Sequence, residues 1–254
     1  MTGQRIAWLL AALWLVPAAT DARAETIVDV ELVIAVDSSA SIDDREFALQ
    51  MAGIAAAFRD PEVIAAIASG PHGRIAVTAM FWAESGWPVD AMPWHVIADA
   101  AGAEGFARMV ESWPRRIEGG TGIGTAVFNG VRLIEDNGLA GVRRIIDVSG
   151  DGRETTMRDF YITAGHARTV ATSRNITVNG LAMLDDEPDL DAYYRDQVIG
   201  GPDAFLMTVH RIEDFAAAMR DKLIREIEHR PMVSRRSGRR GADGGQWIDV
   251  SGLM

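Results

Sequence analysis

Three polar clusters along the sequence carry side chains that could bind a cation. The first places Asp37, Ser39 and Ser41 at alternate positions directly after an apolar run. The second contains Thr121 in a glycine-rich stretch, and the third contains Asp151 with a glycine on each side. A carboxylate with two hydroxyl groups resembles a site for a hard cation such as Mg²⁺, which prefers oxygen ligands. Thr121 and Asp151 each offer a further oxygen, and the neighbouring glycines allow close approach of the backbone.

The elements around these clusters place them at one end of a sheet. The segment 27–36 ends in four unbroken apolar residues, as a buried parallel strand does, and Asp37 follows it. Ser41 followed by Asp44, or Asp43 followed by Glu46, has the spacing of a helix N-cap, and we expect a helix over 43–60. Ligands of open α/β sheets bind at the carboxyl ends of strands. A simpler alternative is that Asp37 and the two serines only cap this helix and close a turn.

Strands and helices alternate along the chain, which predicts an α/β fold: a doubly wound, mostly parallel central sheet with helices on both faces. A proline-containing segment over 87–97 predicts one short edge strand or hairpin. The expected strands span 27–36, 75–82, 143–149, 176–183 and 205–209. The expected helices span 43–60, 103–113, 126–136, 157–173, 189–198 and 213–228.

The amino terminus has the pattern of a secretory signal. Arg5 precedes the apolar run 6–16, and small residues at Ala22 and Ala24 predict cleavage after Ala24. We therefore expect a signal peptide over 1–24, one domain over 25–230 and a flexible Arg- and Gly-rich tail over 231–254. The expected location is outside the cytoplasm, in the periplasm rather than at the outer surface, with no stable membrane insertion after cleavage.

Composition excludes several classes of function. The 254 residues carry a net charge of −11, which argues against nucleic acid as a partner. The chain has no cysteine, so disulfides, thiol catalysis and cysteine metal sites are excluded.

The motifs argue against several classes of enzyme. The glycine-rich loop lacks a lysine after Gly124, so the phosphate-binding pattern fails, and no Gly-x-Ser-x-Gly elbow is present. A magnesium-dependent phosphotransferase or phosphatase with Asp37 as nucleophile is the main enzymatic alternative. Such enzymes usually carry a second aspartate two residues later, where this chain has Ser39. No lysine lies near Asp151 to steady a phosphoryl group.

The three clusters together carry a resemblance to a known family. Asp-x-Ser-x-Ser over 37–41, Gly-Gly-Thr over 119–121 and Ser-Gly-Asp-Gly over 149–152 resemble the metal-ion-dependent adhesion site (MIDAS) of the von Willebrand factor type A (VWA) domain family. The resemblance covers roughly 28–230. It implies metal ligation, directly or through water, by the residues Asp37, Ser39, Ser41, Thr121 and Asp151.

The same resemblance implies a function. The metal would be Mg²⁺ or Mn²⁺, and a carboxylate from a protein partner would complete its coordination, without catalysis. Neutral hydroxyl ligands leave the charge of the cation only partly cancelled, so it still attracts an acidic ligand. The non-enzymatic alternative is a structural domain in which the metal only holds the three loops together and binds no partner.

Two further features refine the resemblance. The segments 179–182 and 198–202 are similar to an uncharacterised branch of exported, single-domain bacterial members, which implies no activity. Asp147 lies in a strand where the family usually has an apolar residue. A buried carboxylate needs a partner, and we expect a hydrogen bond to Arg143 or Arg144. The alternative is that Asp147 orients the serines of the metal site.

Overall fold

The computed structural model describes residues 25–84, 90–155 and 162–228. Its sheet has seven strands in the order β3-β2-β1-β5-β6-β7, with β4 also paired to β2. The strands are β1 Thr26–Asp37, β2 Ile75–Trp82, β3 Asp90–Ala91, β4 His95–Ile97, β5 Leu139–Gly150, β6 Thr177–Met183 and β7 Leu206–Val209. The helices are α1 Asp44–Arg59, α2 Pro61–Ala68, α3 Ala100–Glu111, α4 Ile123–Glu135, α5 Ala164–Ser173, α6 Leu190–Tyr193 and α7 Phe215–Glu228.

The pairing confirms the predicted fold class. β2, β1, β5, β6 and β7 pair in parallel, while β3 and β4 run antiparallel to β2. The expected edge element is thus a pair of two- and three-residue strands, β3 and β4. Residues 85–89, where that segment was expected to begin, lie outside the described part of the chain.

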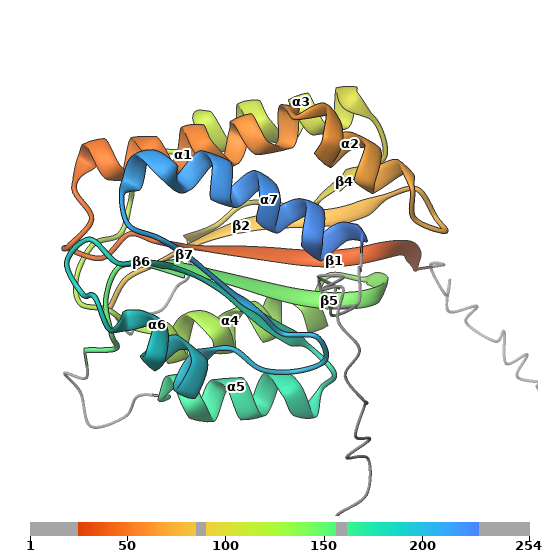
Figure 1. Ribbon diagram of the computed structural model, residues 1–254. Coiled ribbons are helices and arrows are strands. Elements are labelled where there is room, and N and C mark those ends of the chain that lie inside the picture. Colours follow the sequence, from red (N-terminus) through yellow and green to blue (C-terminus); the bar gives the residue numbers. More distant parts are fainter. Residues whose placement is uncertain (1–24, 85–89, 156–161, 229–254) are drawn as a thin grey trace, which may run out of the picture.

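The sheet is covered on both faces (Figure 1). Helices α1, α2, α3 and α7 lie on one face, and α4, α5 and α6 lie on the other. Strand β1 is buried on both sides: Leu32 and Ile34 join the core under α1 and α7, whereas Val33 and Ala35 join the core under α4 and α5. This explains its unbroken apolar sequence. In the described residues, no helix is long and apolar enough to cross a membrane.

Helix capping agrees with the predicted start of α1 and differs from the predicted start of α5. Asp43 accepts a hydrogen bond from the Glu46 amide, and Glu46 accepts one from the Asp43 amide, so α1 begins with the predicted capping box. The helix expected over 157–173 begins only at Ala164, because the Thr163 hydroxyl accepts from the His166 amide and caps it there. Residues 156–161 lie outside the described part of the chain.

Other boundaries also differ from the expected ones. Strand β5 begins at Leu139 rather than at 143, and α3 spans Ala100–Glu111 rather than 103–113. Helix α4 begins at Ile123, three residues before the expected start, and its N-cap Gly122 makes no side-chain capping bond. The segment expected as one helix over 189–198 is a short α-helix followed by a π-helical turn, Tyr194–Val198. π-Helical turns are rare and often lie at functional sites.

Candidate metal centre

The Asp-x-Ser-x-Ser segment forms a tight loop at the carboxyl end of β1. The amide of Ser39 donates to Asp37 Oδ1 at 2.8 Å, which folds the chain back over the aspartate. The hydroxyl groups of Ser39 and Ser41 lie 3.1 Å apart. Asp37 and Ser39 are buried, whereas Ser41 is exposed. One carboxylate and two hydroxyls therefore face a common space at the rim of the sheet.

Asp151 joins the first loop directly. It follows β5, the neighbour of β1 in the sheet, and its Oδ1 accepts a hydrogen bond of 2.8 Å from the Ser41 hydroxyl. Thr121 is near as well, since a Cβ built on Gly152 would lie 3.8 Å from its hydroxyl oxygen. The structure thus gathers all five predicted residues at one end of the sheet.

The loop of Thr121 is tied to both others by backbone bonds. The Thr121 amide donates to the Thr155 hydroxyl at 2.7 Å, and the Thr155 amide donates to the Thr121 carbonyl at 2.9 Å. The Ala40 amide donates to the Gly119 carbonyl at 2.8 Å. Glu154 adds a further tie, because its carboxylate accepts from the amides of Gly124 and Ala164, at the beginnings of α4 and α5.

One oxygen of Asp37 has no partner. Among the described residues, Asp37 Oδ2, the Tyr194 hydroxyl and Trp82 Nε1 are buried without a hydrogen bond. A Cβ built on Gly150 would lie 2.7 Å from the Tyr194 hydroxyl, 2.8 Å from Asp37 Oδ2 and 3.1 Å from a ring carbon of Trp82. Only glycine therefore fits here, between the aspartates at the ends of β1 and β5.

Burial and like charge shape the electrostatics of the two carboxylates. Burial, followed by the charge of Asp151, raises the pKa of the Asp37 carboxyl to about 7. Burial also raises the pKa of Asp151, against the hydrogen bond from Ser41. Both shifts mean that two buried anions lack a compensating positive charge, which a bound cation would supply.

This donor set fits a hard divalent cation. It combines two carboxylates with three hydroxyls and includes the orphaned Asp37 Oδ2. The described residues contain no group of three or more His, Asp or Glu placed to hold a metal. A site here would therefore depend on hydroxyl ligands.

Arg115 supports the first loop and had no signal in the sequence motifs. Its Nη2 donates to the carbonyls of Ser39 at 3.1 Å and Ile42 at 2.8 Å, and its Nη1 donates to Asp44 Oδ1 at 3.0 Å. Its guanidinium also lies 5.6 Å from the centre of the Phe47 ring. The arginine is mostly buried, and its bonds to these carbonyls hold the backbone between Asp37 and α1 in place.

Comparison with known proteins places the chain. The model of the family described as "Protein of unknown function (DUF1194)" matches residues 27–231. The chain belongs to this family. No curated protein sequence matches it.

Solved structures show that this member of the DUF1194 family has a VWA-like fold. It is similar to a von Willebrand factor type A protein from Catenulispora acidiphila (TM-score 0.56, 16% identity, 79% of this chain and 43% of that one). It is also similar to the vWF domain of the type V pili tip protein Mfa5 from Porphyromonas gingivalis (TM-score 0.54, 11% identity, 80% of this chain and 96% of that one). A third similar structure is that of proximal thread matrix protein 1 from the mussel byssus, solved with a zinc-occupied MIDAS motif (TM-score 0.53, 12% identity, 79% of this chain and 48% of that one).

These likenesses concern the fold. The chain spans less than half of the length of the Catenulispora and mussel structures.

The expected partner of Asp147 was wrong. The carboxylate pairs with Lys222 of α7, whose Nζ lies 2.8 Å from Asp147 Oδ1, and both side chains are fully buried. Arg143 instead donates to the carbonyls of Glu226 and Ile227 at the end of α7, and Arg144 donates to the carbonyl of Arg174. Arg143 shares the face of β5 that α7 covers, but it is four residues from Asp147 and is bonded to the end of α7, whereas Lys222 reaches Asp147 directly.

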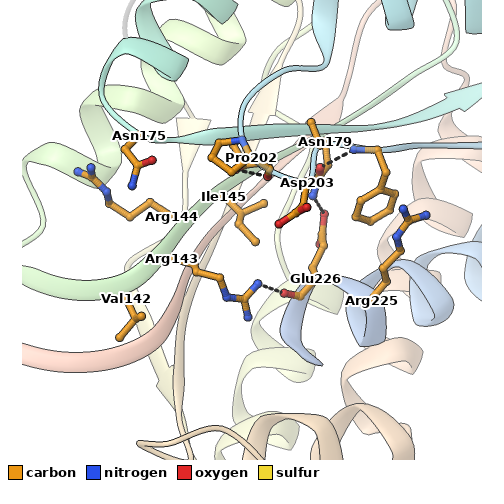
Figure 2. A pocket seen from close by; sticks show the side chains of 13 residues that line it. Val142, Arg143, Arg144, Ile145, Asn175, Asn179, Pro202, Asp203, Arg225 and Glu226 are labelled. Atoms are coloured by element: carbon orange, nitrogen blue, oxygen red, sulfur yellow. Dashed lines mark hydrogen bonds between the residues drawn. The ribbon is translucent and has the colours of Figure 1, made fainter. Parts of the chain in front are cut away.

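A cavity of about 460 Å³ lies at the other end of β5 (Figure 2). It is lined by the first part of β5, by β6 and by the last turn of α7, including Asn179, Arg225 and Glu226. Arg143 and Arg144 at its wall are bonded to backbone carbonyls, and the Arg225 guanidinium lies 3.8 Å from the centre of the Phe205 ring. The cavity is therefore separate from the candidate metal centre.

Proposed function

We propose that this domain binds a divalent cation, Mg²⁺ or Mn²⁺, through Asp37, Ser39, Ser41, Thr121 and Asp151, and uses it to hold a protein ligand. The observation that carries the proposal is the chain of contacts from Asp37 through both serines to Asp151, next to a buried carboxylate oxygen without a partner. Two buried anions in one place are costly unless a cation or protons neutralise them.

The chemistry of the site suggests the kind of partner. A cation held by two carboxylates and three neutral hydroxyls keeps an affinity for a further anionic oxygen. An acidic side chain of a protein partner would supply it, despite the net charge of −11 of the chain. Support for a protein-binding role comes from the fold, which a pilus adhesin, SpaC from Lactobacillus rhamnosus GG, also contains.

The proposal includes no catalysis. A phosphotransferase would need a positive side chain close to the transferred phosphoryl group. The only lysine in the sequence, Lys222, is fully buried against Asp147, and Arg153, the arginine nearest to Asp151 in the sequence, pairs with Glu187. The Asp37 carboxylate itself accepts from the Ser39 amide. Phosphatase turnover that disappears in Asp37→Asn would contradict this part of the proposal.

We further propose that the domain acts after export. The signal pattern over 1–24 and the family match that begins at residue 27 agree with a mature domain over 25–230. The periplasm is the proposed location, and 231–254 is proposed as a flexible tail.

Ligand capture tests the protein-binding role. Wild-type protein on a solid support is exposed to exported proteins of the native cell in Mn²⁺, and bound protein is then eluted with a chelator. The proposal predicts a ligand that elutes with the chelator and does not bind to Asp151→Ala. Retention that is equal in the variant and in chelator would favour the alternative in which the metal only staples three loops.

A further inference from the structure

The only lysine of the chain, Lys222, is fully buried beside two carboxylates. Every other basic residue among the 25 Lys and Arg residues is an arginine. Lys222 Nζ lies 2.8 Å from Asp147 Oδ1 and 2.5 Å from Glu226 Oε1, and the side chains of all three residues are fully buried or nearly so. A plain buried ion pair is weak support for stability, because desolvation offsets the attraction. The arrangement therefore calls for another explanation.

Neighbouring side chains hold the three groups in place. Asp147 is the register partner of Ile34 on one side and Asn179 on the other. Asn179 donates from Nδ2 to Glu226 Oε1 at 2.8 Å, and its own oxygen accepts from the Phe205 amide at 3.0 Å (Figure 2). The ring of Phe205 covers the ammonium group, with Nζ 4.9 Å from the ring centre. An amine, a carboxyl group and a second carboxylate are thus fixed together in an apolar core.

We propose that Lys222 and Asp147 form an intramolecular amide bond, with Glu226 as the proton carrier. This inference goes beyond the metal-dependent function and does not depend on it. Lysine is a good nucleophile when uncharged, and fixed contact between two groups replaces a bimolecular encounter. The ammonium donates to Glu226 Oε1 and lies 2.8 Å from Asp147 Oδ1, so one proton shift within the cluster leaves an uncharged amine beside a carboxylic acid.

The reaction balances without an external reagent. Lys222 Nζ attacks Asp147 Cγ, and a C–N bond forms. Glu226 takes a proton from the nitrogen and returns it to a hydroxyl group on Cγ, so that the C–O bond breaks and one water molecule leaves. Nothing is oxidised or reduced. Glu226 lines the cavity at the base of β5, which gives the released water a short path outward.

The local electrostatics act on the two reacting groups in opposite senses. Burial lowers the pKa of the Lys222 amine, but the charges of Asp147 and Glu226 outweigh it and raise that pKa, so the uncharged amine forms only by proton transfer within the cluster. Burial raises the pKa of the Asp147 carboxyl to about 7, with Lys222 opposing and Glu226 adding to the shift, so the acid form is accessible at neutral pH. An amide would also remove two charges from the core. It would join β5, which leads to Asp151, covalently to α7.

A lysine-specific endoprotease tests the bond on the full chain, because the sequence offers one cleavage site. The protein is folded, then denatured, digested and weighed by mass spectrometry. We expect wild type to remain one piece, lighter by one water than its sequence. Asp147→Ala and Glu226→Gln should be cut after Lys222 into two fragments. Asp221→Ala, at an exposed residue next to Lys222, is the control and should remain one piece like wild type.

Peptide mapping then locates the bond. We expect one branched peptide that contains Lys222 and Asp147. Complete cleavage of wild type at Lys222, with no loss of water, would overturn the inference. A bond from Lys222 to Glu226 in place of Asp147 would overturn it as well. Because the measurement is made on denatured chains, the wild-type result stands even if a variant folds poorly.

Discussion

The Ser41 hydroxyl donates a hydrogen bond of 2.8 Å to Asp151 Oδ1 across 110 residues of sequence. This contact joins the loop after β1 to the end of β5, its neighbour in the sheet. The two segments meet because parallel strands bring their carboxyl ends to one edge. The proposed metal centre is a direct consequence of this register.

The two glycines beside Asp151 should respond differently to alanine. A methyl group on Gly150 would lie 2.7 Å from the Tyr194 hydroxyl and 2.8 Å from Asp37 Oδ2. Overpacking of this kind costs about 1–3 kcal/mol, so Gly150→Ala should lower the free energy of unfolding by that amount and weaken metal binding. Urea denaturation and metal titration measure the two effects.

Gly152→Ala is the matched control for that substitution. Its Cβ would make only an ordinary contact, 3.8 Å from the Thr121 hydroxyl. We expect a change in unfolding free energy within about 0.5 kcal/mol, as for most substitutions without a buried clash. Equal losses in both variants would show that Gly150 is not specially constrained.

Arg115 should matter far more than its neighbour Arg116. Arg115→Ala removes donors to the carbonyls of Ser39 and Ile42, which should cost about 1–3 kcal/mol because buried acceptors lose their partners. The exposed Arg116 donates to Asp90 Oδ1 at 3.0 Å. Arg116→Ala should cost at most about 1 kcal/mol, as exposed pairs do. Thermal unfolding of both variants in chelator decides whether Arg115 holds the loop.

Stability without metal should fall as pH rises toward neutrality. Burial, and secondarily the Asp151 charge, raises the pKa of Asp37 to about 7, whereas an unfolded aspartate titrates near ~3.9. Between these values the folded chain keeps a proton that the unfolded chain releases, so this group stabilises the fold less at each higher pH. Above pH 7 its contribution becomes constant.

Comparison with Asp37→Asn isolates this effect, because the variant has no proton to lose at that position. Denaturant unfolding in chelator between about pH 4.5 and 8, a range that begins above the unfolded pKa of about 3.9 and includes the folded pKa of about 7, should show a steeper decline for wild type, by at most ~1.4 kcal/mol per pH unit. Parallel curves for the two proteins would mean that Asp37 is ionised throughout.

Part of this architecture could be predicted from sequence, because its signals are local. The apolar run before Asp37, the capping residues Asp43 and Glu46 and the glycines around Asp151 each mark an element end. The positions of these ends were enough to predict the parallel sheet and the candidate metal ligands.

Contacts between distant segments had no such signal. Arg115 donates to carbonyls 73 and 76 residues earlier in the chain, and no local sequence pattern predicts such a contact. Lys222 is different, since a signal was present: it and Glu226 fall within the apolar stripe of α7, between buried residues such as Met219 and Leu223. A charged pair in that position indicates a buried partner, which the structure shows to be Asp147.

Calorimetric titration of the folded protein with Mn²⁺ and Mg²⁺ tests the central claim most directly. Asp37→Ala, Thr121→Ala and Asp151→Ala, each checked for its fold by circular dichroism, are titrated beside wild type. Saturable binding to wild type at one site per chain, lost in all three variants, is the predicted result. Binding that persists in folded Asp37→Ala and Asp151→Ala, or no binding to wild type, would contradict the assignment of this site as a metal centre.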